Sequence, residues 1–179
     1  MVLSCQHHLV RGSVIPCLQA IKINPGYAEA YDNRGTTYAE KGEFDKALAD
    51  YSKAIEIYPQ FASAYYNRAV VYEQQGEYDK AISDFAKAIE IDQDYAGAYC
   101  NRGLAYGKKG QLDLAIADWD KAIEINPAMA EAYNNRAVAY LGTKEYDKAW
   151  ADVEKAQSLG SKFPDAFLEK LRQVSGRDK

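Results

Sequence analysis

Small and apolar residues recur along this chain with a period of 34 residues, and within each period their spacing is helical. In the first complete copy Tyr31, Gly35 and Tyr38 lie four and three residues apart, which places them on one face of a helix. A turn signal at Gly42 interrupts this pattern, and a second helical pattern follows until Pro59, which cannot continue a helix. Each period therefore predicts two antiparallel helices joined by a short turn.

Large and small side chains alternate at fixed columns of the repeat. Tyrosine fills two columns of the first helix, whereas glycine or alanine fills one column of the first helix and two of the second. Large side chains opposite small ones let helices approach closely, and one helix pair alone cannot bury such faces. Successive copies must therefore stack, and the sequence predicts an all-α fold, an α-solenoid of helix pairs that begin at Ala28, Ala62, Ala96 and Ala130.

The order of aromatic, Gly or Ala, Tyr, Ala, aromatic, Ala and Pro resembles the tetratricopeptide repeat (TPR) family, in its bacterial-type YxNRG/A form. The resemblance spans about residues 28–161 and implies a right-handed superhelix with four full repeats, at 28–61, 62–95, 96–129 and 130–163. The sequence departs from the pattern at Gln93, which replaces the proline that ends a repeat, and at Lys144, which replaces the turn glycine.

Partial units are predicted at both ends of the chain. Residues 13–27 align with a second helix only, and residues 164–174 resemble a C-terminal capping helix with apolar residues on one side. Residues 1–12 match nothing in the repeat and are predicted to be a flexible segment, and residues 175–179 form a tail. Two alternatives stay open for the N-terminal end: the half-unit closes the array, or the chain is a fragment of a longer TPR protein.

Composition argues against several classes of function. The net charge of −4 and the pI near 5.3 disfavour a nucleic-acid binder, and no apolar run is long enough to cross a membrane. Three cysteines without metal-ligand spacing fit a reducing compartment, so we expect a cytoplasmic protein with no metal and no cofactor. His7 and His8 lack a third ligand, and Cys5 lacks the apolar segment of a lipidation signal. Without a nucleophile motif or a phosphate loop, we expect no enzyme.

The resemblance implies that first helices line a concave groove that binds a peptide. An asparagine recurs at one register on the outward face of the first helices, at Asn33, Asn67, Asn101 and Asn135. A carboxamide offers both a donor and an acceptor, so it can pair with a peptide backbone whatever its side chains. The alternative is that these asparagines bond to the backbone of a neighbouring unit or face water, and the sequence leaves both interpretations open.

The columns that vary between repeats carry information about specificity. One holds Asp32 in the first repeat and then Tyr66, Cys100 and Asn134, and another holds Thr36 and then Val70, Leu104 and Val138. Apolar residues in a row on a non-packing face suggest a binding patch, to which Gly107 and Leu141 add small or apolar surface. The alternative is that they contact the adjacent first helix.

The first repeat is acidic on the same face, with Glu29, Asp32 and Glu40. We therefore expect a protein or peptide partner with an apolar segment and a basic residue near the first repeat. Family members that grip the acidic tail of heat-shock chaperones use Lys and Arg on this face, whereas the columns here hold acidic, neutral or apolar residues, so no such clamp is expected.

An arginine on the packing face of each first helix lies 16 residues before an aspartate of the second helix. A partly buried guanidinium needs such a partner, so we predict structural salt bridges in place of an anion site. The predicted pairs are Arg34 with Asp50, Arg68 with Asp84, Arg102 with Asp118, and Arg136 with Asp152. The competing interpretation pairs each aspartate with the lysine three residues on, at Lys53, Lys87, Lys121 or Lys155.

These patterns favour a non-catalytic protein–protein interaction module or scaffold. The alternative is a self-associating structural array, or homo-oligomer, whose ends stack on other copies.

Overall fold

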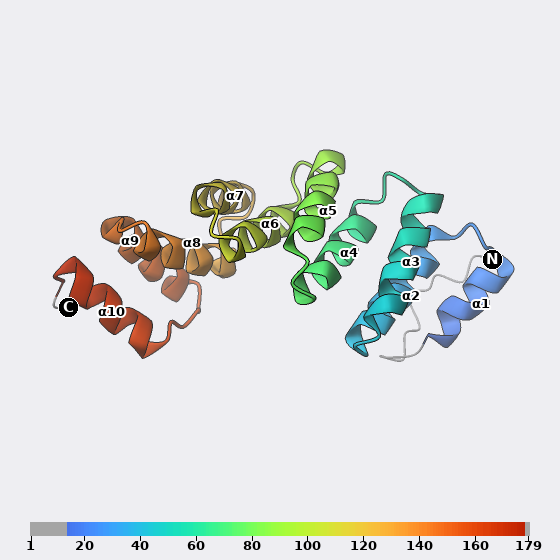
Figure 1. The fold of residues 1–179 in the computed structure, drawn as a ribbon, viewed down its shortest axis with the longest axis horizontal. Coiled ribbons are helices and arrows are strands. Elements are labelled where there is room, and N and C mark those ends of the chain that lie inside the picture. The colour runs from blue at the N-terminus through green and yellow to red at the C-terminus, as the bar shows by residue number, and fades with distance from the viewer. Residues whose placement is uncertain (1–13, 178–179) are drawn as a thin grey trace. The chain divides into compact units, whose positions relative to one another are not determined.

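The computed structural model describes residues 14–177, which are helical apart from short connections (Figure 1). The helices of this part are α1 (Ile15–Ile23), α2 (Ala28–Glu40), α3 (Phe44–Ile57), α4 (Ala62–Gln74), α5 (Tyr78–Ile91), α6 (Ala96–Lys108), α7 (Leu112–Ile125), α8 (Ala130–Gly142), α9 (Tyr146–Ser158) and α10 (Asp165–Ser175). The described residues contain no strand, and the predicted all-α class is confirmed. The predictions for Cys5, His7 and His8 lie outside the described residues.

The chain divides into two compact units, Met1–Gln93 (unit 1) and Asp94–Lys179 (unit 2). In unit 1, α2 pairs with α3 and α4 with α5, while α1 packs on α2 and α3 packs on α4. In unit 2, α6 pairs with α7 and α8 with α9, while α7 packs on α8 and α10 packs on α9. Each pair is an antiparallel hairpin whose first helices are α2, α4, α6 and α8 (Figure 1).

The second helices end at one column of the repeat with or without a proline. Helix α3 ends at Ile57, two residues before Pro59, and a residue before proline avoids the helical conformation. Helix α5 ends at the same column, at Ile91, although Gln93 replaces the proline. Asp92 there adopts an extended backbone with φ −129° and ψ 98°. The proline ring is therefore not required to end this helix.

The turn between the two helices of a repeat requires a left-handed backbone. Gly42, Gly76 and Gly110 adopt φ values of 74°, 76° and 75°, which glycine tolerates because it has no Cβ. Lys144 occupies the equivalent position in the fourth repeat with φ 64°. The turn therefore forms there against the conformational preference of an L side chain.

We expect Lys144→Gly to stabilise the protein by about 1 kcal/mol, because it removes the left-handed penalty of a residue with a Cβ. Urea denaturation of the full chain measures the change. The matched control is Gly110→Lys, since an added Cβ at Gly110 meets nothing within 4 Å and introduces backbone strain alone. This control should destabilise by a similar amount, and equal stability of all three proteins would show that the turn is unstrained.

At one position of the second helices the side chain differs in size between repeats, and the residue that faces it on the first helix is glycine where that side chain is largest. A Cβ added at Gly35 would lie 2.8 Å from Tyr51 Cε1, and one added at Gly103 would lie 2.8 Å from Trp119 Nε1. Glycine is therefore needed opposite these two large rings. In the other repeats alanine accompanies smaller residues at the same columns, as Ala69 with Phe85 and Ala137 with Val153.

Helix α10 covers the end of unit 2. Leu171 is fully buried in a cluster that includes partly buried Phe163 and Phe167, whose ring centroids lie 5.1 Å apart. Trp150 Nε1 of α9 donates a hydrogen bond to Ser175 Oγ of α10 at 3.0 Å. These contacts fix the helix over the apolar surface of α9.

Candidate functional site

The arginine of each first helix forms a two-pronged ion pair with an aspartate of the second helix. In the first repeat, Arg34 Nε and Nη2 donate to the two carboxylate oxygens of Asp50 at 2.7 and 2.6 Å. These hydrogen bonds are the main cause that raises the pKa of Arg34. The structure brings the other pairs together in the same way, as Arg68 with Asp84, Arg102 with Asp118, and Arg136 with Asp152. Each guanidinium group thus pairs with an aspartate of its own repeat, and two also reach the preceding repeat: Arg68 Nη1 donates to Ser52 Oγ at 3.0 Å, and Arg136 Nη1 pairs with Asp120.

The lysines of the competing interpretation have other partners. Lys53, Lys87 and Lys121 pair with the glutamates three residues further on, at distances of 2.6, 2.6 and 2.8 Å. The interpretation that pairs them with the buried aspartates is therefore wrong for these three lysines.

The asparagine column is half-buried on the first helices. Asn67 Nδ2 on α4 donates to Asp32 Oδ1 on α2 at 3.0 Å. In unit 2, Asn135 lies near the thiol of Cys100 and lowers its pKa slightly, but Asn135 Nδ2 is buried with no hydrogen-bond partner among the described residues. Asn101 is half-buried on α6. Asn67 therefore links two adjacent first helices through a side chain, an arrangement that differs from the contacts with a partner, a neighbouring backbone or water that the sequence left open.

Asn33 differs from Asn67 and Asn135. Its backbone carbonyl accepts a hydrogen bond from Thr37 Oγ1 at 3.0 Å. Its carboxamide has no hydrogen-bond partner among the described residues, which include no first helix before α2.

Cys100 does not line an open surface. Its side chain is only 2% exposed, because it packs in a cluster with Trp119 and Ala132. Burial raises the pKa of its thiol to about 12. The neighbouring helices of unit 2 thus cover Cys100 and leave little of it for the partner contact predicted from the sequence.

Tyr66 and Asn134, in the same column as Cys100, are half-buried. The ring of Tyr66 packs on buried Phe85 with a centroid distance of 5.6 Å, so part of its surface is used within unit 1. Asn134 Nδ2 donates to Ser161 Oγ at 2.6 Å, which ties α8 to the segment before α10. Both residues thus have structural contacts, which the sequence did not reveal.

Val138 is the most open member of the apolar column. Its side chain is 55% exposed, whereas Val70 and Leu104 are half-buried. Leu141 lies one helical turn further along α8 and is also half-buried. The first helices of unit 2 therefore present an apolar surface centred on Val138.

The first helices of unit 1 present an acidic surface. Glu29 and Glu40 are exposed, and Asp32 is only 8% exposed. Burial raises the pKa of Asp32, the hydrogen bond from Asn67 lowers it, and the nearby charge of Glu29 raises it. The hydroxyl of neighbouring Tyr51 donates to Thr36 Oγ1 at 3.3 Å. Burial raises the pKa of Tyr51 to about 12. Asp32 is thus a buried carboxyl group in negative surroundings.

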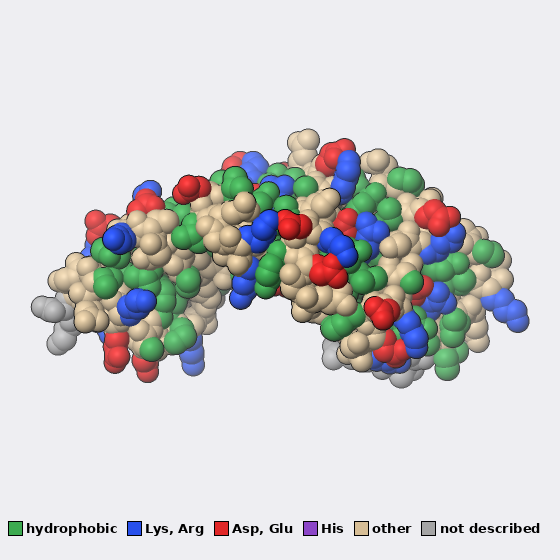
Figure 2. Space-filling view, in the orientation of Figure 1, with side chains coloured by type: hydrophobic (Ala, Val, Ile, Leu, Met, Phe, Trp, Pro, Cys, Tyr) green, Lys and Arg blue, Asp and Glu red, His purple; other side chains and the backbone are tan. Residues whose placement is uncertain are grey.

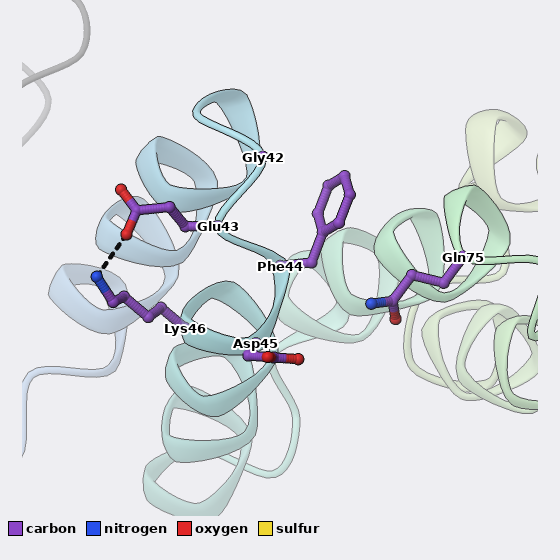
Figure 3. A pocket seen from close by; sticks show the side chains of 6 residues that line it. All are labelled: Gly42, Glu43, Phe44, Asp45, Lys46 and Gln75. Atoms are coloured by element: carbon purple, nitrogen blue, oxygen red, sulfur yellow. Dashed lines mark hydrogen bonds and ion pairs between the residues drawn. The ribbon is translucent and has the colours of Figure 1, made fainter.

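A surface depression of about 370 Å³ lies beside the turn of the first repeat (Figure 3). Phe44 of α3 and Gln75 at the end of α4 project toward this space, and Glu43 pairs with Lys46 at 2.5 Å. Charged, polar and aromatic side chains thus line this depression. The residues are Gly42, Glu43, Phe44, Asp45, Lys46 and Gln75.

Residues 14–177 contain no group of three or more His, Cys, Asp or Glu side chains placed to hold a metal ion. Over the same residues, no helix is both long and apolar enough to span a bilayer. Acidic and basic side chains are interspersed on the face drawn in Figure 2, without a broad basic area.

The link between Asp32 and Asn67 was not predicted from the sequence. The two residues lie 35 positions apart, which is one repeat plus one residue, and Cys100 and Asn135 have the same separation. This spacing was the available signal, but only the packing of α2 against α4 shows that the two side chains meet.

Comparisons with solved structures place the chain among known repeat proteins. It is 28% identical to the protein in "Crystal structure of MamA", with a TM-score of 0.74, covering 91% of this chain and 89% of that one. It is 26% identical to the first TPR of Spaghetti (RPAP3) bound to HSP90 peptide SRMEEVD, with a TM-score of 0.64, covering 65% and 93%. Pseudomonas aeruginosa PilF shares the fold, with 20% identity and a TM-score of 0.82, covering 90% of this chain and 75% of that one.

A comparison with curated protein sequences gives no significant match. Family models, in contrast, match most of the chain. A model described as "TPR repeat" matches residues 35–76. One model described as "Tetratricopeptide repeat" matches residues 62–95 and 96–129, and a second model of that description matches residues 17–49 and 119–151. Together with the paired helices, these matches show that the chain belongs to the tetratricopeptide repeat family.

Proposed function

We propose that this chain is a non-catalytic protein–protein interaction module that binds a partner protein or peptide on its first helices. The observation that carries the proposal is the 55% exposure of Val138, an apolar side chain on a first helix, beside half-buried Leu141. Contiguous apolar patches mark interaction sites, and we take Val138 and Leu141 as the exposed part of one such patch. The surface centred on Val138 receives an apolar segment of the partner.

The acidic surface of unit 1 receives a basic side chain of the partner. Asp32, Glu29 and Glu40 lie on α2, and the charge of Glu29 acts unfavourably on buried Asp32. A lysine or arginine from a partner would compensate this charge. The HSP90 peptide SRMEEVD, bound by the first TPR of RPAP3, is acidic, and we expect this surface to repel it. The cytoplasmic location expected from cysteine use stays a prediction.

A peptide-display selection against the full chain tests the proposal, with affinities then measured by fluorescence anisotropy. We expect selected peptides to combine an apolar segment with a lysine or arginine, and Val138→Glu to weaken their binding at least tenfold. Leu114→Glu is the matched control, because Leu114 is 49% exposed but lies on the second helix α7. Equal affinities of the two variants would contradict binding on the first helices.

The basic contact has its own test in Asp32→Asn. We expect this variant to weaken binding of a selected peptide, while replacing the peptide's arginine with neutral citrulline should weaken binding to the wild type only. Binding of citrulline and arginine peptides with one affinity to the wild type would remove the basic contact from the proposal.

The same variant should stabilise the free protein. Burial raises the pKa of Asp32 in the folded protein above its value in the unfolded chain. As pH rises from the unfolded pKa to the folded pKa, ionisation of Asp32 therefore lowers the stability of the folded state. At neutral pH, we expect the free energy of unfolding of Asp32→Asn to be about 1 kcal/mol higher than that of the wild type. The difference should vanish below the ordinary aspartate pKa, about 3.9, where the wild-type group is neutral in both states. Urea denaturation at several pH values measures it, and a constant difference would exclude this cause.

A second candidate function is self-association through α1. Ile15, Leu18 and Ile23 are 61%, 44% and 77% exposed on this helix. Light scattering at several concentrations distinguishes the two functions: a concentration-dependent mass that is lost in Ile15→Ser/Leu18→Ser favours self-association.

A further inference from the structure

The first-helix arginines of the second and fourth repeats each bind a second acceptor, which lies on the preceding second helix. Arg136 holds Asp152 of its own repeat with Nε and Nη2, while its Nη1 pairs with Asp120 of α7. In unit 1, Arg68 Nη1 donates to Ser52 Oγ of α3 at 3.0 Å. Both acceptors lie 16 residues before their arginine. One guanidinium group therefore serves two acceptors at once, and the outer one comes from a fixed column.

Arg34 lacks this second acceptor. Its Nε and Nη2 donate to Asp50, but the residue 16 positions earlier, on α1, is Leu18, whose side chain accepts no hydrogen bond. Arg34 Nη1 has no hydrogen-bond partner among the described residues, and it is open to solvent. Asp120, in the column of Leu18, has a 54% exposed side chain, so this column lies at the surface. A carboxylate that arrives from solvent can therefore reach Arg34 as Asp120 reaches Arg136.

Helix α1 presents apolar side chains beside this nitrogen. Ile15 and Leu18 are 61% and 44% exposed, and residues three apart are neighbours on a helix, so the two form one apolar patch. The complete repeats hold small or polar residues in both columns: Ala49, Ser83, Ala117 and Ala151 in the first, and Ser52, Ala86, Asp120 and Glu154 in the second. Large aliphatic side chains in these two columns thus occur on α1 alone.

The charge on this face of α1 is positive. Lys22 lies one helical turn beyond Leu18, is exposed, and has no ion-pair partner among the described residues. Lys53 on α3, in contrast, pairs with Glu56 at 2.6 Å. Helix α1 contains no acidic residue. Charge complementarity on this face therefore favours a partner that carries carboxylates.

We propose that Ile15, Leu18 and Arg34 form a second interaction surface, which binds an acidic, apolar segment of a partner protein. Aliphatic side chains of the segment cover the patch on α1, and one of its carboxylates accepts from Arg34 Nη1. This carboxylate takes the place that Asp120 has against Arg136. The proposal goes beyond the surface centred on Val138 and does not depend on it.

A random peptide library displayed against the full chain with Val138→Glu tests the proposal, because this substitution is expected to weaken binding to the first helices. We expect the enriched peptides to be apolar and negatively charged. Replacing their Glu and Asp residues with Gln and Asn should weaken binding about tenfold in fluorescence anisotropy. Enrichment of neutral or basic peptides, or of none, overturns the proposal.

Leu18→Asp locates the binding surface. The new carboxylate would lie 16 residues before Arg34, as Asp120 lies before Arg136, so it should occupy Nη1 and weaken binding of an enriched peptide at least tenfold. Leu114→Asp is the matched control, because it makes the same change at a 49% exposed leucine of another second helix, α7, and it should leave the affinity unchanged. Equal losses in the two variants overturn the proposal.

The side-chain NMR signals of Arg34 supply a readout that needs no substitution at the surface. We expect them to shift when an enriched peptide binds, while those of Arg68, whose Nη1 already holds Ser52, stay in place. Arg34 signals that do not respond to the peptide overturn the proposal.

A second copy of this chain is the competing occupant of the surface on α1. Light scattering of the chain alone separates the two: a constant mass supports the proposal, whereas a mass that rises with concentration, and does so in Leu114→Asp but not in Leu18→Asp, overturns it. The first-helix proposal fails by a different result. That result is wild-type affinity of Val138→Glu for peptides whose binding Leu18→Asp leaves unchanged.

Discussion

Arg102→Leu should destabilise the protein by about 3 kcal/mol, because it leaves the carboxylate of Asp118 buried without a cation. Both oxygens of Asp118 accept from Arg102 at 2.7 Å, and the aspartate is 7% exposed. Breaking such a pair costs far more than replacing both partners, so Arg102→Leu/Asp118→Leu should recover most of the loss. Urea denaturation followed by circular dichroism measures all three proteins.

Lys121→Leu is the control for this prediction. Lys121 also pairs with a carboxylate, Glu124, at 2.8 Å, but that pair is exposed and should contribute little. The outcome that contradicts the structural role is a stable Arg102→Leu protein with weakened partner binding, since the guanidinium would then be a ligand contact.

Gly103→Ala should destabilise the protein by about 1–3 kcal/mol through overpacking. The new Cβ would lie 2.8 Å from Trp119 Nε1 and 3.1 Å from the carbonyl oxygen of Ala115, and that backbone atom cannot move aside easily. Trp119 is itself fixed, because its Nε1 donates to the carbonyl oxygen of Cys100 at 3.1 Å. The strain therefore has no simple route of relaxation.

A double-mutant cycle separates overpacking from the general effect of adding a methyl group to a helix. Gly103→Ala/Trp119→Phe recreates the pair that the second repeat holds as Ala69 and Phe85. The double variant should be more stable than the sum of the single changes by about 1 kcal/mol or more. Additive losses would show that the glycine and the ring do not constrain each other.

Much of the fold could be predicted because the same sequence pattern recurs in each repeat. The register of Tyr31, Gly35 and Tyr38 returns in every copy, and such agreement between spacing, turns and size is hard to satisfy with another fold. The ion pairs were accessible for the same reason, since four matched arginines and aspartates share one separation.

The candidate site was less accessible, because exposure on a helix face depends on how closely the next helix approaches. Cys100 and Val138 both lie on the face opposite the packing stripe, yet Cys100 is 2% exposed and Val138 is 55% exposed. The approach of α8 to α6 buries the first, whereas the second stays open. Periodicity within one helix contains no information about this difference.

The sequence by itself determined the helix pairs, the repeat family and the pairing of opposite charges, because these follow from local periodicity and from repetition. Only the tertiary structure decided which side chains of the outward face are open and which link neighbouring repeats. Asn67 meets Asp32 at 3.0 Å because α2 and α4 pack side by side with a fixed offset. Both first helices also pack on α3, whose Tyr51 lies in one buried cluster with Val71 of α4, so the contact between Asn67 and Asp32 depends on three helices and no single helix encodes it.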